Sequence, residues 1–156
     1  MDKNKIIKNF IVVVIFLFLS CSNSNKEKVK IYYKKINENV QLPNGIKFNG
    51  MKNGLWIEYD TIGTIRSVES FINGIPEGEL RLYDGYGSII QKNEIHNGVY
   101  NGVYEYFGAN GKLLTKGFYL NNKKNGNWFY FDEKGKPTKK EVWKNGELEL
   151  KIRVIS

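Results

Sequence analysis

The sequence predicts an all-β fold: an antiparallel meander of repeated β-hairpins that forms one elongated single sheet. Three observations predict it. Gly54, Gly78, Gly102 and Gly126 recur at intervals of 24 residues. Asn-Gly pairs, the strongest short hairpin signal, recur with the same period. Between the pairs lie runs rich in aromatic and β-branched residues, which favour strands.

Four repeat units follow from this period, and together they cover residues 54–149. Offsets are counted from the glycine that opens each unit. Apolar side chains stand at offsets two, five and seventeen, and glycine or asparagine stands at offsets nine, nineteen and twenty. Offset two, for example, holds Trp56, Leu80, Tyr104 and Trp128.

Each unit is expected to form two antiparallel strands, at offsets one to six and eleven to eighteen. The glycines and the substituting asparagine mark positions where the backbone adopts a positive φ. One hairpin cannot bury its own apolar face, whereas stacked hairpins share a continuous one. Eight strands spaced by about 4.8 Å give a sheet close to 40 Å wide. Because offsets two and five differ in parity, either a bulge separates them or both faces of the sheet are partly covered.

Capping segments flank the four units. Residues 29–53 are expected to cap the N-terminal side, with a strand at Val29–Tyr33, turn chemistry at Gln41–Gly45 and a degenerate half-repeat at Asn49-Gly50. Residues 150–156 continue an alternating pattern and form the C-terminal capping strand, where Leu150 replaces the expected glycine. The lysine and glutamate positions of the alternating tail, which runs from Glu147 to Val154, are expected to blunt the exposed edge.

The first twenty residues are a predicted signal peptide. Three lysines precede Phe10–Leu19, which is an uninterrupted run of ten apolar residues. As a helix this run would be roughly 15 Å long, about half of a bilayer's hydrocarbon core. The run therefore has the size of a secretory segment and not of a membrane span.

Leu19-Ser20-Cys21 resembles the lipobox of bacterial lipoproteins, in which the cysteine is acylated and becomes the new N-terminus. The resemblance implies a lipid anchor on Cys21, a tether over residues 21–28 and a place in the cell envelope outside the cytoplasm; inner and outer membrane both stay open. Cys21 is the only cysteine, so acylation would exclude disulfides and thiol chemistry. The whole chain carries +8 and residues 1–20 carry +2, which leaves +6 after processing.

No catalytic constellation is predicted, and no cofactor or metal is implied. His96 is the only histidine and occupies a repeat position where the other units have Ile72, Leu120 and Lys144, so it is interpreted as a drifted position. A catalytic histidine needs an orienting acid together with a nucleophile or a metal. The carboxylates are spread along the array, as on a solvated face. The protein is therefore expected not to be an enzyme.

Two columns are candidates for binding. Lys92, Lys116 and Lys140 share offset fourteen, and their ammonium groups are expected to form a ladder at roughly 10 Å intervals. Such a ladder could meet anionic lipid, a polyanionic glycan or an acidic protein, or it could be an ordinary soluble face; nucleic acid is not an expected partner outside the cytoplasm. The column of Trp56, Tyr104 and Trp128 could stack on a ligand but is predicted to be the buried core.

The repeat pattern resembles the bacterial variant of the MORN repeat. Its nearest instances are Gly102-Val-Tyr104-Glu-Tyr-Phe107 and Gly126-Asn-Trp128-Phe-Tyr-Phe131. The resemblance implies hairpin sheets that contact proteins or membranes and do not catalyse reactions. The expected function is thus a membrane-anchored binding or scaffold module. The alternative is an immunity or antitoxin-type inhibitor of one cognate protein toxin, since some proteins of this kind are labelled antitoxins.

Overall fold

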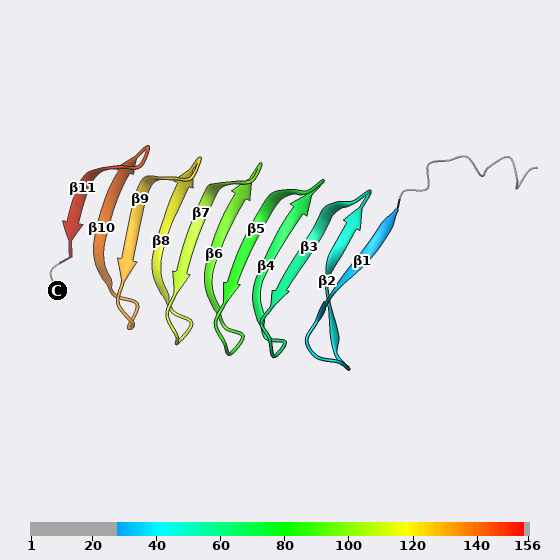
Figure 1. Ribbon diagram of the computed structural model, residues 1–156. Coiled ribbons are helices and arrows are strands. Elements are labelled where there is room, and N and C mark those ends of the chain that lie inside the picture. Colours follow the sequence, from blue (N-terminus) through cyan, green and yellow to red (C-terminus); the bar gives the residue numbers. More distant parts are fainter. Residues whose placement is uncertain (1–27, 155–156) are drawn as a thin grey trace, which may run out of the picture.

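The protein is all-β. The computed structural model describes residues 28–154, and these form one open antiparallel sheet in which every strand pairs with its neighbours in the chain (Figure 1). The strands are β1 (Val29–Lys35), β2 (Gln41–Phe48), β3 (Met51–Tyr59), β4 (Ile65–Ile72), β5 (Ile75–Tyr83), β6 (Ile89–His96), β7 (Val99–Phe107), β8 (Leu113–Leu120), β9 (Lys123–Phe131), β10 (Pro137–Lys144) and β11 (Glu147–Arg153). The predicted meander of hairpins is therefore confirmed. The predicted signal peptide and Cys21 lie outside the described residues.

Tight turns, most of them Asn-Gly, join the strands at one end, and longer loops join them at the other end (Figure 1). Asn73 and Gly74 have φ values of 49° and 83°, and the equivalent residues in the other turns are also positive. Positive φ at both central residues is the type I′ geometry, whose twist matches that of the strands it joins. In the last-but-one turn Asn122 takes the glycine place at φ 65°.

Acidic caps hold most of the longer loops. The carboxylate of Asp132 accepts hydrogen bonds from the backbone N–H groups of Lys134 and Lys136, at 2.9 and 2.8 Å. These bonds hold the pKa of Asp132 below its ordinary value. Asp60 and Asp84 make the same pair of bonds in their units, so the loop is a repeated Asx turn.

The glycine that opens each unit lies inside a strand and does not begin it. The first strand of the hairpin starts four residues earlier than the sequence predicts, because the tight turn ends at Gly50 and pairing resumes at once. Gly126 has a φ of 67° beside a register shift between β8 and β9. Glycine therefore supplies the conformation that a bulge requires.

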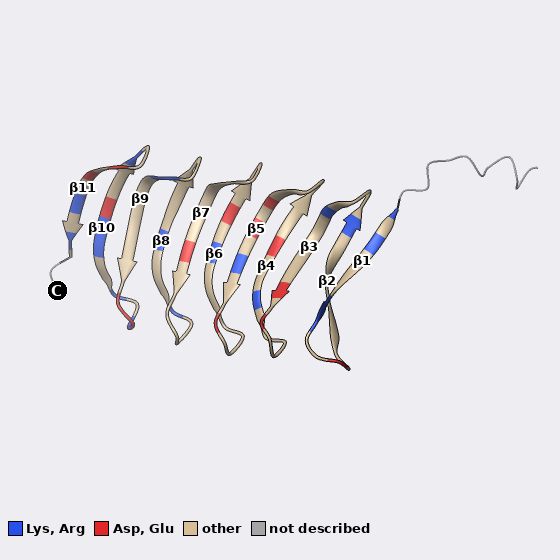
Figure 2. Cartoon of the chain, viewed as in Figure 1, with Lys and Arg blue, Asp and Glu red and all other residues tan. Residues whose placement is uncertain are grey.

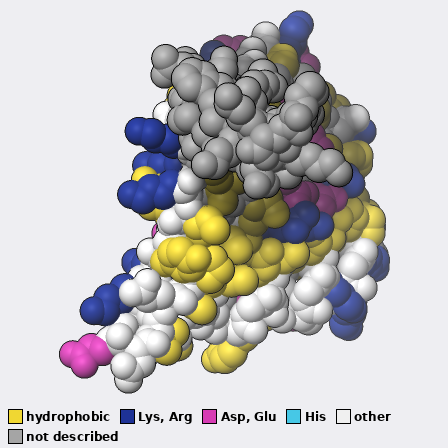
Figure 3. Space-filling view, turned by 90° about the vertical axis from the view of Figure 1, so that its right-hand side faces the viewer, with side chains coloured by type: hydrophobic (Ala, Val, Ile, Leu, Met, Phe, Trp, Pro, Cys, Tyr) yellow, Lys and Arg dark blue, Asp and Glu magenta, His cyan; other side chains and the backbone are white. Residues whose placement is uncertain are grey.

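Offsets two and five lie on opposite faces, so the second alternative holds and both faces are partly covered: Phe107, at offset five, lies beside Lys92. Each unit also has a register shift opposite offsets four and five, for example at Glu58 and Tyr59, but its extra residue belongs to the partner strand. Both faces also carry apolar side chains, because Trp128 and the row that contains Phe129 lie on opposite faces. Viewed from the β1 side, hydrophobic side chains gather in a band, with lysine and arginine mostly at its margins (Figure 3).

One local prediction is wrong. Residues Gln41–Gly45 are not a turn but the first half of β2, and the connection to β1 lies at residues 36–40. Pro43 is tolerated in this strand because a register shift interrupts the pairing between Tyr32 and Tyr33 at that place. The pairing partner β1 supplies the contacts that override the local turn chemistry.

Candidate binding surface

An aromatic seam crosses one face of the sheet and forms the core. Among the described residues, the apolar side chains that are fully buried are Trp56, Phe71, Ile95 and Trp128, and Trp128 is only 1% exposed. Tyr104 is half-buried, with its ring 5.2 Å from Trp128 and 5.6 Å from Tyr119. The column at offset two therefore packs into the seam at Trp56, Tyr104 and Trp128.

Two of the tryptophans lie flat on glycines of the neighbouring strand. A Cβ atom built on Gly117 would overlap the ring of Trp128, and one built on Gly45 would overlap the ring of Trp56. The indole N–H groups donate to the backbone oxygens of Phe118 and Ile46, at 3.2 and 3.1 Å. Each tryptophan thus keeps its polar atom satisfied while the rest of the ring is buried.

Lysines cover the seam at both ends. The ammonium group of Lys124 lies 4.2 Å from the ring centre of Trp128 and 4.8 Å from that of Trp143. Lys52, at the equivalent position three units earlier, lies 4.6 Å from the ring centre of Trp56. Burial holds the pKa of Lys124 below its ordinary value, although Glu141 opposes that shift. These cations stabilise the aromatic faces and close them to a ligand.

Glu141 is the most strongly bonded acid of the seam. Its carboxylate accepts hydrogen bonds from the Tyr130 hydroxyl at 2.6 Å, the Trp143 indole N–H at 3.1 Å and the Lys139 ammonium at 2.9 Å. Burial raises its pKa, but the three donors outweigh burial and bring the pKa to about 2. At Glu69, which holds the same repeat position, burial raises the pKa and Lys52 only partly offsets it.

The three predicted lysines lie on the opposite face, in one row that crosses the sheet. Successive members of the row are direct cross-strand partners, one from each strand from β3 to β11. We call this set the lysine row: Ile57, Val68, Arg81, Lys92, Glu105, Lys116, Phe129, Lys140 and Ile152. The structure therefore brings the offset-fourteen lysines together on β6, β8 and β10.

The lysine row is not purely basic. Glu105 stands between Lys92 and Lys116, and it accepts a 2.9 Å hydrogen bond from Lys116. Arg81 adds a fourth cation on β5. Acidic and basic segments accordingly lie side by side at mid-height of β5–β8 (Figure 2). On β9 the row has an apolar member, Phe129, between Lys116 and Lys140. The ammonium group of Lys140 lies 5.5 Å from the ring centre of Phe129.

Sequence reasoning missed Arg81 and Glu105 because it compared each position only with its own column. Both stand at offset three, directly across from the lysine column. A cross-strand comparison of offsets three and fourteen would have found them. It would have shown that the ladder alternates with other residues.

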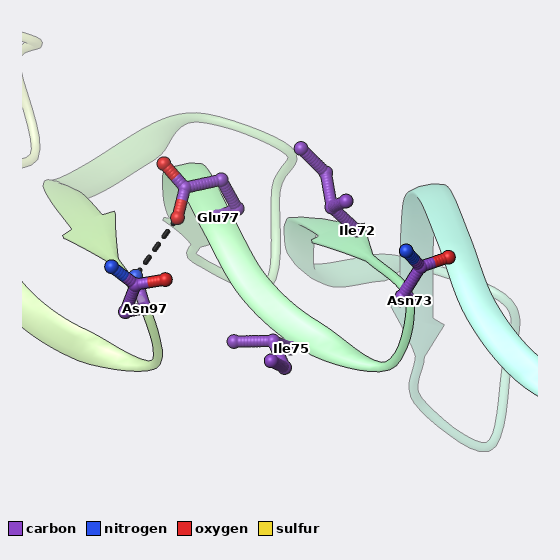
Figure 4. A pocket seen from close by; sticks show the side chains of 5 residues that line it. All are labelled: Ile72, Asn73, Ile75, Glu77 and Asn97. Carbon is purple, nitrogen blue, oxygen red and sulfur yellow. Dashed lines mark hydrogen bonds between the residues drawn. The ribbon is translucent and has the colours of Figure 1, made fainter.

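A hollow lies between two tight turns, around Glu77. Its lining residues are Ile72, Asn73, Ile75, Glu77 and Asn97 (Figure 4). The Glu77 carboxylate accepts a 2.8 Å bond from the backbone N–H of Asn97 and lies 2.8 Å from Nδ1 of His96. Those contacts hold the pKa of Glu77 below its ordinary value. His96 therefore has an orienting acid, but none of the residues that line this hollow is a nucleophile.

Within residues 28–154, no group of three or more His, Cys, Asp and Glu side chains is placed to hold a metal ion. Over the same range, no helix has the length and apolar character to cross a membrane. No known protein-family model matches the chain, and no curated protein is similar enough to count as a relative.

Proposed function

We propose that the protein is a non-catalytic binding or scaffold module of the cell envelope, held to a membrane through an acyl group on Cys21. The observation that carries the binding role is the lysine row, which crosses one face of a single-layer sheet from β3 to β11. On the opposite face, lysines lie over the aromatic rings at both ends of the seam.

The cations of the row suit a partner with negative charge, such as anionic lipid, a polyanionic glycan or an acidic protein surface. Arg81, Lys92, Lys116 and Lys140 lie on strands one or two apart, although Arg81 is paired with Glu79 and Lys116 with Glu105. The side chain of Lys116 is 49% exposed even while it contacts Glu105. Such groups can exchange an internal partner for an external one at little cost.

A second candidate is an immunity-type inhibitor of one cognate protein toxin, and the position of Glu105 favours it. A row that carries both signs of charge matches one particular protein surface better than a uniform polyanion. Glu79 and Glu94 lie near the same lysines and strengthen the mixed character. An exported protein of this kind would act outside the cytoplasm.

Affinity capture tests the proposal and separates its two forms. Residues 22–156 would be used to recover ligands from envelope extract of the native cell. Anionic lipid or glycan, lost when Lys92, Lys116 and Lys140 are all changed to Glu, would support the surface-binding module. One stoichiometric protein would support the inhibitor. Retention of every ligand by the triple variant would rule out the lysine row as the site.

The matched control reverses the same number of charges on the other end of the sheet. Lys30, Lys34 and Lys35 lie on β1, well away from the row. Their change to Glu lowers the net charge equally. If this control lost the ligand as fully as the row variant, binding would follow net charge and not the row.

A further inference from the structure

One end of the sheet exposes a continuous set of apolar side chains, on the face that also carries the lysine row. The set spans β1 to β5 and reaches the end of the sheet where the tight turns lie. We call it the apolar end. Its exposed members, whose exposure ranges from 40% to 62%, are Val29, Ile31, Ile46, Met51, Leu55, Ile72 and Ile75.

Contacts on the opposite face fix which residues belong to the apolar end. The rings of Tyr32 and Trp56 contact each other in the seam, and Lys47 and Lys52 lie over them. Side chains alternate between the two faces along a strand, so the residues next to these four point the other way. The cross-strand pairs on that side are Val29 with Phe48, Ile31 with Ile46, Phe48 with Met51, Ile57 with Val68, and Ile72 with Ile75.

Charged and apolar side chains are segregated at this end in an unusual way. Lys30 and Lys47 lie over the ring of Tyr32 on the seam face, at 5.4 and 4.8 Å from its centre. Val29 and Ile31, on the other face of the same edge strand, are exposed to solvent. A contiguous apolar surface without lysines among its members is typical of a contact with a membrane or a protein.

The length of the chain before β1 links this end to the membrane. The backbone N–H of Lys28 donates to the Asn49 side chain, and the Lys28 carbonyl accepts a bond from the Asn49 backbone N–H, at 3.2 and 3.1 Å. The chain thus enters the sheet at the first tight turn, next to Val29. Cys21 precedes Lys28 by seven residues, which span at most about 24 Å. An acyl group on Cys21 would therefore keep the apolar end close to the bilayer.

We propose that the apolar end lies on the membrane that holds the anchor, with its side chains at the boundary between headgroups and acyl chains. This inference rests on the proposed acylation of Cys21. Apolar surfaces that bind in this way enter a bilayer by about 5–10 Å. Acyl chains alone leave a domain free to turn about its tether, whereas a second contact through the sheet fixes its orientation.

The orientation also limits what the lysine row can bind. Along the row, Ile57 and Val68 are followed by Arg81 and Lys92 on the same face. Contact of the apolar end with the bilayer therefore places these two cations beside the headgroups. Anionic lipid is then their nearest partner, because basic groups next to a membrane surface are attracted to its negative charge.

The first test measures depth with a polarity-sensitive fluorescent label on the full-length chain, purified from membranes and reconstituted in vesicles of phosphatidylcholine and phosphatidylglycerol. Leu55→Cys carries the label within the apolar end. Ile152→Cys is the matched control, since Ile152 is a 45% exposed member of the row on β11, at the far end of the same face. Lipids with a nitroxide on the acyl chain should quench the label at position 55 roughly twofold more strongly than the label at 152.

The outcomes separate this inference from the anchor. Equal quenching at positions 55 and 152, in protein that stays with the vesicles, would overturn the membrane contact and leave the anchor intact. A parent chain whose Cys21 takes up the label and that does not stay with the vesicles would remove the anchor, and this inference with it. Shielding of the label at 55 in detergent micelles that increases with protein concentration would place a second copy on the apolar end, and would also contradict the inference.

The second test asks whether the side chains of the apolar end, and not the label, cause the insertion. With the label at Met51→Cys, Ile31→Glu together with Leu55→Glu should abolish the quenching by acyl-chain nitroxide. Leu150→Glu together with Ile152→Glu is the matched control on β11 and should leave it unchanged. The four replaced residues are at least 45% exposed, so both variants should melt like the parent. Quenching that survives in the Ile31 and Leu55 variant would overturn the inference.

Discussion

The buried acid Glu141 should make the stability of the fold depend on pH in a way that one substitution removes. Its side chain is in the buried class at 5% exposure, and its pKa falls from an ordinary 4.5 to about 2. Each unit of pKa shift corresponds to about 1.4 kcal/mol, so ionised Glu141 contributes about 3 kcal/mol at neutral pH. Because the folded pKa is the lower one, this contribution is complete above about pH 5 and is lost as the pH falls toward 2.

Comparison of the parent with Glu141→Gln isolates this contribution. The amide keeps the shape and still accepts the Tyr130 hydroxyl, but it cannot carry charge. In urea unfolding followed by tryptophan fluorescence, the parent should be about 3 kcal/mol more stable at pH 7, and the difference should shrink below about 1 kcal/mol at pH 2. The other carboxylates whose pKa is lowered contribute equally to the unfolding free energy of both proteins, so they cancel in the difference. A difference that stayed constant across this pH range would refute the reasoning.

Three further predictions follow from the seam and the anchor. Gly117→Ala should cost about 1–3 kcal/mol in a urea titration, because the new Cβ overlaps Trp128, while Gly85→Ala meets only the Arg66 side chain at an ordinary contact distance and should change stability by less than about 1 kcal/mol; equal effects would contradict the close approach. Tyr104→Asp should abolish cooperative thermal unfolding, because it places a charge among packed rings, whereas Lys116→Glu should leave the melting temperature within a few degrees; a Tyr104 variant that melts like the parent would show that the column is not core. Cys21→Ser should move the protein from the membrane to the soluble fraction on cell fractionation, and continued sedimentation with membranes would remove the lipid anchor from the proposal.

The repeat period and the turn chemistry were readable from the sequence because they depend on local backbone geometry. The Asn-Gly pairs of the tight turns, such as Asn73-Gly74, adopt positive φ, and their 24-residue spacing predicts the hairpins and the strand order. The same reasoning failed at Gln41–Gly45, where turn-like residues pair with β1. There a tertiary partner, which no local rule describes, decided the conformation.

The candidate surface was only half visible in the sequence. The column of Lys92, Lys116 and Lys140 followed from the period alone. The presence of Glu105 within the same row did not, because cross-strand neighbours depend on register, and the bulges shift the register within every unit. Strand β11 shows the same limit. Its alternation of charged and apolar residues is plain in the sequence, but only the order of the described strands shows that it lies at an edge of the sheet.

The sequence by itself determined the class of fold, the number of units, the positions of the tight turns and the column that packs as the core. Tertiary structure alone decided which residues share a face, how Glu141 accepts bonds from three donors, and which strands form the two edges of the sheet within residues 28–154. The physical reason is the range of the interactions. Turns and strand propensities act over a few residues, whereas faces, buried networks and edges arise from pairing between strands about 20 residues apart.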